Sequence, residues 1–136
     1  MKQNRDIKEE IIQKLKNFLY EEREIIFAYL HGSFLNENEF NDVDIALYLD
    51  KKALKKINPV DLEISLSLRL EKDVKVPVDV KILNDAPLCF RYQATRRYLL
   101  FSRDDSIRED FLVRTWSEYF DFIPVSKIYL REAFFA

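Results

Sequence analysis

The segment Tyr29-Leu-His-Gly-Ser-Phe34 ends one apolar run, and Asp42-Val-Asp44-Ile-Ala-Leu-Tyr-Leu49 begins the next after a short polar loop. Gly32 is the only glycine among the 136 residues, and it stands directly before Ser33. A glycine lets the backbone approach a phosphate closely, and neighbouring amides and a serine hydroxyl can donate hydrogen bonds to that phosphate. Gly32 and Ser33 are therefore candidate phosphate-binding residues.

Two aspartates open the second apolar run. Alternate side chains of a strand point to the same side, so Asp42 and Asp44 are expected to share one face. Two carboxylates on one face suit a hard cation such as Mg²⁺, which would itself bind substrate phosphates. This pattern indicates phosphate and metal chemistry at the start of a buried strand.

A third aspartate lies in the apolar segment Val76-Pro-Val-Asp79-Val-Lys-Ile-Leu83. Alternation places Asp79 and Lys81 on one face of this strand and the valines on the other. A carboxylate amid valines in a buried strand costs free energy unless a cation or hydrogen-bond donors compensate it. The alternatives are a metal ion and a salt bridge to Lys81 or an arginine, and the convergence of three carboxylates favours the metal.

In its order of Gly-Ser, loop, Asp-x-Asp and a further strand aspartate, the chain resembles the polymerase-β-like nucleotidyltransferases. It more closely resembles their minimal form, the MNT proteins, because Leu83-Asn-Asp-Ala-Pro-Leu88 and the aromatic C-terminal helix also look like MNT antitoxins. The resemblance covers most of the chain. It implies an α/β nucleotidyltransferase fold, with a small mixed sheet, packed helices and a long C-terminal helical region. Residues 1–136 would form a single minimal nucleotidyltransferase domain.

The resemblance also implies an activity and a set of catalytic residues. Asp42, Asp44 and Asp79 would be the catalytic carboxylates and would hold two Mg²⁺ ions, with ATP as the substrate. Gly32 and Ser33 would hold the β- and γ-phosphates. The reaction would transfer AMP to an acceptor hydroxyl as pyrophosphate leaves, and Asp79 could also accept the proton of that hydroxyl.

Proteins that share these motifs commonly act as antitoxins paired with a HEPN-domain ribonuclease toxin. The implied acceptor is a tyrosine of the toxin, and the implied assembly is a hetero-oligomer of the two proteins. A non-catalytic antitoxin that only masks its toxin is one alternative. Nucleotidyl transfer to a small molecule such as an aminoglycoside is the other, and the short chain disfavours it.

The sequence allows two roles for each of several basic side chains. His31, the single histidine, ends the first strand and is expected to make structural hydrogen bonds, with a phosphate contact as the alternative. Arg91, Arg96 and Arg97 either form a solvated face or reach the triphosphate. The loop 34–41 holds no arginine, whereas many nucleotidyltransferases carry an Arg-Gly pair there.

Composition narrows the class and location of the protein. The net charge of −2 creates no basic field, so direct nucleic-acid binding is not expected. No apolar run has membrane-spanning length, and the first residues lack a signal-peptide core. The single cysteine, Cys89, excludes an internal disulfide and suits a reducing cytosol. We expect a cytoplasmic protein.

The periodicity of apolar residues predicts the other elements. They are a helix over about 4–23, strands over 24–30, 43–49, 76–83 and 98–102, a helix over 86–97 capped by Asp85, and a helix from about 105. Residues 60–70 are ambiguous, because their apolar residues alternate as in a strand. The sequence Asn58-Pro59-Val-Asp61 offers a helix cap and first turn, so we predict a helix there.

The C-terminal helix carries an apolar stripe that is expected to lie mainly in the core and consists of Leu112, Trp116, Tyr119, Phe120 and Ile123. Pro124 should break or kink this helix. The aromatic residues beyond it, Tyr129, Phe134 and Phe135, exceed what a small domain leaves exposed and indicate a protein interface.

Overall fold

The computed structural model describes residues 4–32, 34 and 42–135, the stretch 125–135 as backbone only. The predicted α/β fold is confirmed. Its elements are α1 (Asn4–Tyr20), β1 (Ile25–His31), β2 (Val43–Leu49), α2 (Lys51–Leu54), α3 (Pro59–Val74), β3 (Val78–Ile82), α4 (Leu88–Thr95), β4 (Tyr98–Ser102) and α5 (Asp105–Phe135). The loop 35–41 and Ser33 lie outside the described residues.

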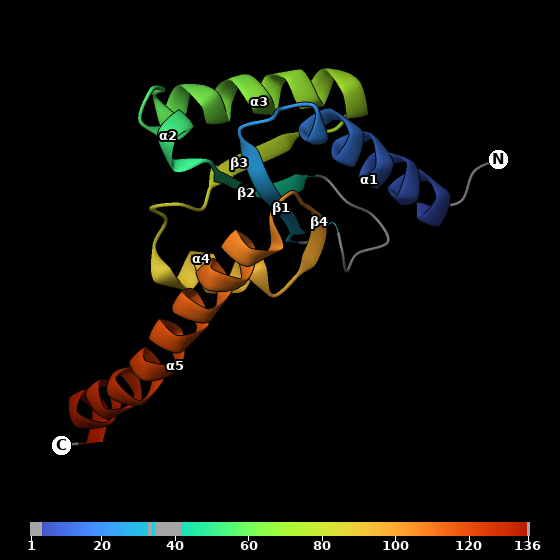
Figure 1. Cartoon of the computed structure of the whole chain (residues 1–136). Helices are drawn as coiled ribbons and strands as arrows, with labels where there is room; N and C mark the ends of the chain where they lie inside the picture. Colours follow the sequence, from blue (N-terminus) through green and yellow to red (C-terminus); the bar gives the residue numbers. More distant parts are fainter. Residues whose placement is uncertain (1–3, 33, 35–41, 136) are drawn as a thin grey trace.

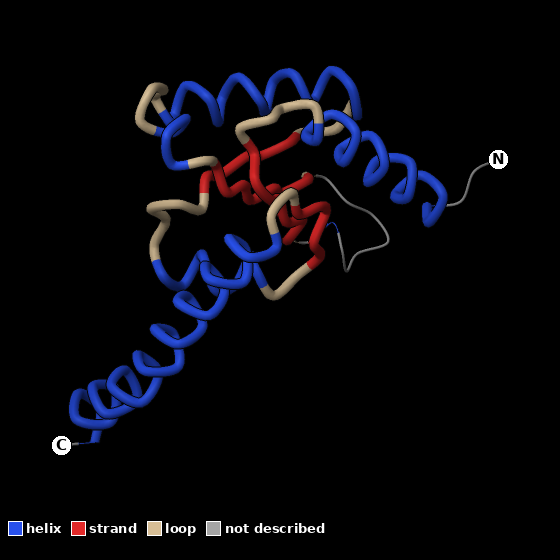
Figure 2. The backbone as a smooth tube through the Cα atoms, viewed as in Figure 1, coloured by secondary structure: helices blue, strands red, loops and turns tan. Residues whose placement is uncertain are grey.

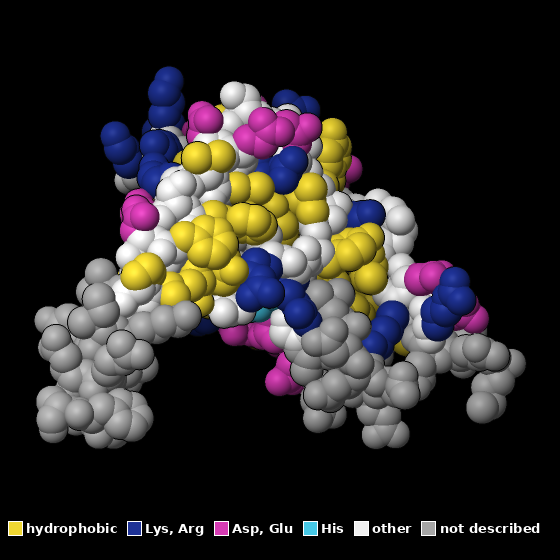
Figure 3. All heavy atoms as spheres, turned by 90° about the horizontal axis from the view of Figure 1, so that it is seen from below, with side chains coloured by type: hydrophobic (Ala, Val, Ile, Leu, Met, Phe, Trp, Pro, Cys, Tyr) yellow, Lys and Arg dark blue, Asp and Glu magenta, His cyan; other side chains and the backbone are white. Residues whose placement is uncertain are grey.

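The four strands form one mixed sheet in the order β3-β2-β1-β4. Strand β1 pairs antiparallel with both β2 and β4, whereas β2 and β3 are parallel. Helices α1 and α3 cover one face, and α4 and the first part of α5 cover the other (Figures 1 and 2). Figure 3 looks onto the α4/α5 side.

The central strands are buried on both faces, as their continuous apolar runs predict. One hydrophobic cluster joins the sheet to α1 and α3 through residues such as Leu15, Ile45 and Leu66. The other joins it to α4 and α5, with the Phe27 and Tyr48 rings stacked at 4.9 Å. The sheet is therefore the middle of three layers, and its side chains alternate between two cores.

The ambiguous segment 60–70 is helical, as the capping signals predict. The Asn58 side chain accepts hydrogen bonds from the amides of Val60 and Asp61, and Pro59 occupies the first helical position. Of the six alternating apolar residues, Leu66 and Leu70 are buried, Leu62 is partly buried, and the others are exposed: Val60, Ile64 and Leu68. The strand-like alternation thus reflects two apolar sides of one helix.

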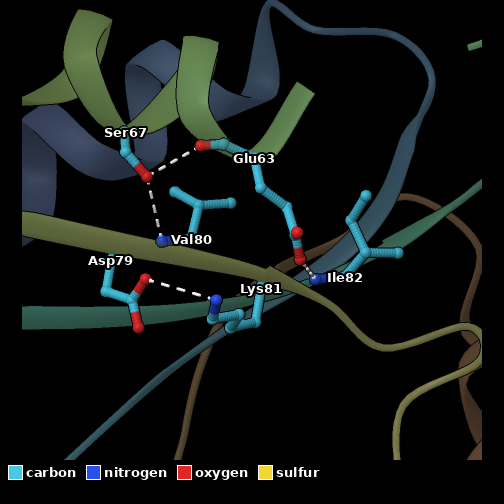
Figure 4. A network of polar contacts seen from close by, with 6 residues as sticks. All are labelled: Glu63, Ser67, Asp79, Val80, Lys81 and Ile82. Atoms are coloured by element: carbon cyan, nitrogen blue, oxygen red, sulfur yellow. Dashed lines mark hydrogen bonds and ion pairs between the residues drawn. The ribbon is translucent and has the colours of Figure 1, made fainter. Parts of the chain in front are cut away.

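Helix α3 also protects the outer edge of the sheet. Three of its side chains, spaced four residues apart, accept hydrogen bonds from alternate amides of β3: Glu71 from Val78, Ser67 from Val80 and Glu63 from Ile82, at 3.0, 3.1 and 2.9 Å. Figure 4 shows the bonds of Ser67 and Glu63. The spacings match, because four helical residues and two strand residues both advance about 6 Å. Amides that could recruit another strand are thereby satisfied.

Replacement of Ser67 by alanine should destabilise the protein by about 1 kcal/mol, because the amide of Val80 loses its acceptor. Ser65→Ala is the matched control, since Ser65 lies on the exposed side of the same helix. Urea unfolding of both variants measures the difference. Equal unfolding free energies for the two variants would show that the bond to β3 contributes nothing.

One local prediction needs correction, and one short helix was not predicted. Asp85 does not cap α4, which begins at Leu88 with Pro87 in the cap position and no side-chain cap bond. The chain first makes a turn, in which Asn84 donates to and accepts from the backbone of Leu49 at 2.9 Å. Sequence reasoning also missed the short helix α2, whose N-cap is Asp50.

The expectation that the α5 stripe lies mainly in the core is wrong. Trp116 and Phe120 are 37% and 55% exposed, whereas the fully buried side chains in the described part of this helix, up to residue 124, are Phe111 and Thr115. The reason is geometric, because α5 extends away from the sheet and only its first turns face β1 (Figure 1). The helix also runs through Pro124 without a break. The side chains of Tyr129, Phe134 and Phe135 lie outside the described residues.

Within the described part of the chain, no helix is both long and apolar enough to cross a membrane.

Candidate active site

Three neighbouring strands bring polar side chains together at one end of the sheet. Asp44 on β2 is the register partner of His31 on β1 and of Asp79 on β3. Asp44 alternates with Ala46 and Tyr48, which pack toward α4 and α5, so it lies on that side of the sheet. From this side, acidic side chains are seen to gather beside the single histidine (Figure 3).

The position of the Asp44 carboxylate requires a residue without a side chain at position 32, which is Gly32. Its φ angle is +82°, a conformation that side chains rarely adopt. A Cβ atom on Gly32 would lie 3.1 Å from Cγ of Asp44 and closer still to Oδ2. The turn after β1 and the carboxylate on β2 can occupy these positions only if residue 32 lacks a side chain.

The charges at this end of the sheet act on one another. Burial raises the pKa of Asp44, and the neighbouring carboxylates of Asp79 and Asp42 raise it further, while His31 opposes them. Burial lowers the pKa of His31, against the opposite effect of Asp44 and Asp79. The site therefore holds more negative charge than its surroundings compensate.

Asp79 is more exposed than predicted. Its side chain is 57% exposed, and β3 is an edge strand of the sheet. Asp79 and Lys81 project from the side of β3 opposite to α3 (Figure 4). Lys81 Nζ lies 3.9 Å from Asp79 Oδ1, so the alternative ion pair is present. Exposed ion pairs contribute little, so this contact does not prevent Asp79 from binding another cation.

His31 differs from its expected role. Its Nε2 is buried and has no hydrogen-bond partner among the described residues. Its ring meets the ring of Phe90 edge-on, with centroids 5.4 Å apart. Sequence reasoning did not single out Phe90, because nothing in the local pattern places α4 against the end of β1.

The three arginines fall into different environments. Arg91 is engaged with the Ala86 carbonyl, Thr115 and Glu118, which ties α4 to α5. Arg96 lies over the ring of Tyr92. The charge of Arg97 contributes to lowering the pKa of His31, so Arg97 is the arginine of the three that acts on His31.

The acidic residues fit a hard divalent cation in their chemistry. No group of three His, Cys, Asp or Glu side chains in the described part of the chain is already arranged to hold a metal ion. However, Asp44 and Asp79 stand on adjacent strands, about 4.8 Å apart in a sheet, and both offer carboxylate oxygens. Burial, and then the charges of Asp79 and Asp42, raise the pKa of Asp44, and a bound cation would favour its ionised form.

A mixed sheet with a glycine turn after β1, an Asp-x-Asp that leads into β2 and an aspartate on β3 is the arrangement of a nucleotidyltransferase. The sequence model of the family described as Polymerase beta, Nucleotidyltransferase matches residues 13–106. The chain therefore belongs to the polymerase beta nucleotidyltransferase family. No curated protein matches the sequence.

Solved structures with a similar fold come from toxin–antitoxin complexes. A chain in the structure of a tri-AMPylated Shewanella oneidensis HEPN toxin with MNT antitoxin aligns with 19% identity and a TM-score of 0.70, covering 93% of this chain and 98% of that one. A toxin–antitoxin structure with AMP-PNP aligns with 20% identity and a TM-score of 0.71, covering 90% and 97%. An MntA–HepT structure aligns with 19% identity and a TM-score of 0.64, covering 95% and 97%. These likenesses show the fold.

Proposed function

We propose that this protein transfers AMP from ATP to a hydroxyl of a partner HEPN ribonuclease toxin and acts as the antitoxin of that partner. The observation that carries the proposal is the register of Asp44 with Asp79, with Gly32 seated against the Asp44 carboxylate. This constellation combines hard cation ligands with a backbone turn that a phosphate can approach.

Each residue of the site has a distinct part in the proposed reaction. Asp42 and Asp44 hold the cations, and Gly32 and Ser33 hold the β- and γ-phosphates. Two bound Mg²⁺ ions would make the acceptor hydroxyl more acidic and neutralise charge on the α-phosphate. Asp79 shares one of the two cations and also accepts the proton of the acceptor hydroxyl.

The bond changes of the proposed reaction balance. The acceptor oxygen forms a bond to the α-phosphorus, and the bond from that phosphorus to the bridging oxygen of the β-phosphate breaks. Pyrophosphate leaves with the electron pair of this bond, and the proton of the acceptor hydroxyl passes to Asp79. Attacking and leaving oxygens lie roughly in line.

The partner assignment has two supports. One similar chain comes from the structure of a tri-AMPylated HEPN toxin in complex with MNT antitoxin. In this chain, α5 exposes large apolar side chains, among them Trp116, Phe120 and Phe122. Exposed aromatic residues on one helix are typical of a protein interface, so α5 is the surface we assign to the toxin, in a hetero-oligomer. We place the activity in the cytoplasm, where Cys89 would stay reduced.

ATP labelled at the α-phosphate should label the partner in the presence of Mg²⁺, whereas ATP labelled at the γ-phosphate should not. Asp79→Asn should lower the labelling rate about 10²-fold, because the active site then lacks the carboxylate that takes the proton of the acceptor hydroxyl and that serves as a cation ligand. Asp73→Asn is the control, since Asp73 is an exposed carboxylate at the end of α3. Labelling from the γ-phosphate would mean phosphoryl transfer and would refute the proposal.

Neutralisation by binding alone is the second candidate, and the exposed aromatic side chains of α5 favour it. In that case Asp42→Ala would still rescue the growth of cells that express the toxin, and Phe120→Ser would not. Under the catalytic proposal, both variants fail: Asp42→Ala does not rescue growth, and neither does Phe120→Ser.

A further inference from the structure

A cavity of about 690 Å³ lies at the end of β2 that is opposite to the candidate active site. Tyr48 lines it and points to the same side of the sheet as Asp44, which lies four residues earlier on β2 and about 13 Å away along the strand. The other lining residues come from α2 and its last turn, the start of α3, the turn before α4, α4 and α5. Figure 1 shows α2 and the start of α4 on the side of the molecule away from α1. None of the lining residues belongs to the candidate active site.

Positive charge dominates this basic cavity. The carboxylate of Asp85 is the one acidic group of its lining, whereas four side chains are cationic: Lys51, Lys55, Arg91 and Arg114. Arg91 is paired with Glu118, at 3.2 Å. The other three cations form no ion pair among the described residues. Three uncompensated cations around one cavity favour an anionic ligand there.

Tyr48 adds a hydrogen-bond donor to the basic cavity. The residue is only 5% exposed, and its ring stacks on that of Phe27. Its hydroxyl makes no hydrogen bond to any described residue. Burial raises the pKa of Tyr48, against the opposite effect of the Arg114 charge, so the hydroxyl keeps its proton at neutral pH and can donate it. A ligand with acceptor oxygens would give this hydroxyl a partner.

An apolar cavity of about 430 Å³ adjoins the basic one. The two cavities share Leu54, Pro59, Asp85 and Ala86 as lining residues. Further apolar side chains line only the second cavity: Ile82, Pro87 and Phe90. A ligand with its charged group in the basic cavity can therefore place an apolar body in the apolar one.

We infer that these two cavities bind an organic phosphate, with the phosphate group among Lys51, Lys55 and Arg114 and an apolar body in the adjoining cavity. A phosphate monoester carries about −1.5 to −2 charges at neutral pH and three acceptor oxygens, whereas a carboxylate carries a single charge. Three free cations and a hydroxyl donor match the phosphate better. This site is separate from the proposed transfer of AMP and does not depend on it.

Amide chemical shifts of the isotope-labelled full chain, recorded without Mg²⁺, locate the site. Phenyl phosphate is the main probe, and inorganic phosphate and benzoate serve for comparison. We expect phenyl phosphate to shift the amides of Lys51, Lys55 and Ala86, and to leave those of Gly32 and Asp44 in place. Inorganic phosphate lacks the apolar body and benzoate lacks the second charge, so each should bind about tenfold more weakly.

A short peptide that carries phosphotyrosine distinguishes the source of the phosphate. Tighter binding of the peptide than of phenyl phosphate would assign the site to a phosphorylated protein. Equal or weaker binding of the peptide would assign it to a free organic phosphate.

Two pairs of lysine substitutions test the role of charge. Lys51→Gln with Lys55→Gln removes two cations of the cavity, and Lys52→Gln with Lys56→Gln is the matched control, since these lysines lie in the same segment but outside the basic lining. The first pair should weaken phenyl phosphate binding at least about tenfold, and the second should leave it unchanged. Tyr48→Phe keeps the stacked ring and removes only the hydroxyl, so it should weaken binding about fivefold.

Three results would overturn the inference. Phenyl phosphate shifts none of the cavity amides, or the two lysine pairs weaken its binding equally, which would indicate attraction by surface charge in general. Benzoate that binds as tightly as phenyl phosphate would indicate a carboxylate ligand, such as an acidic peptide segment, in place of a phosphate.

Discussion

Replacement of Gly32 by alanine will lower nucleotidyl transfer about 10²-fold or more, the cost expected when catalytic groups shift by about 1 Å. A methyl group at residue 32 would overlap the Asp44 carboxylate, so either the turn or the carboxylate must move. The positive φ angle of +82° also opposes alanine, with an expected loss of about 1–2 kcal/mol in the free energy of unfolding. Transfer assays and urea unfolding measure the two effects.

Lys75 supplies the counterpart for this experiment. It ends α3 with a φ angle of +61° and is the non-glycine residue with positive φ in the described part of the chain. Lys75→Gly should raise the free energy of unfolding by about 1 kcal/mol and leave transfer unchanged. If Gly32→Ala keeps full transfer while it loses stability, Gly32 serves only the conformation of the turn.

Asp44→Asn will lower transfer at least about 10²-fold, because it removes a proposed cation ligand, and even the supporting residues of metal sites contribute 10–100-fold. The same change should raise the thermal stability of the ligand-free protein. The pKa of Asp44 is raised in the folded state by burial and by its acidic neighbours. An uncharged amide of the same shape avoids this unfavourable charge.

The sign of this effect follows from linkage. The carboxyl ionises less readily in the folded protein than in the unfolded chain, so its ionisation destabilises the fold. The penalty is fully present at neutral pH and disappears as the pH falls below the ordinary value of 3.8. The stability difference between Asp44→Asn and wild type should therefore vanish in acid.

Mg²⁺ with a nucleotide analogue completes the comparison. It should raise the melting temperature of the wild type, because a ligand that binds only the folded state stabilises it, and it should do so much less for Asp44→Asn. A variant that is less stable than the wild type without Mg²⁺ would show that the Asp44 carboxylate makes favourable contacts within the protein. The interpretation that the ionised Asp44 carboxylate is unfavourable in the folded protein until a cation binds would then be wrong.

The fold could be predicted in detail where local chemistry and periodicity agree. The strands around Ala46 and Val80 follow from apolar runs. At α3, the Asn58 cap and Pro59 outweighed a strand-like alternation, because a capped first turn specifies a helix whereas alternation reflects only which sides are apolar. A family resemblance supplied the expectation that Asp79 belongs with Asp44, and the register of β2 with β3 brings them together.

Features that depend on packing between segments far apart in the sequence could not be predicted from the sequence. The exposure of the α5 stripe depends on how far the helix extends beyond the sheet, which no residue pattern of the helix itself encodes. Asp85 has the chemistry of a helix cap, yet the turn that Asn84 anchors to Leu49 delays the helix. The contact of His31 with Phe90 likewise joins segments far apart in the sequence.

Intact-mass spectrometry of a HEPN partner co-expressed with this protein tests the central claim most directly. The wild type should add the mass of one or more AMP groups to the partner, and the Asp42→Ala, Asp44→Ala double variant should add none. Peptide mapping should place the AMP on a tyrosine. An unmodified partner in a stable complex with the wild type, with ATP and Mg²⁺ supplied, would contradict the claim and leave an antitoxin that acts by binding.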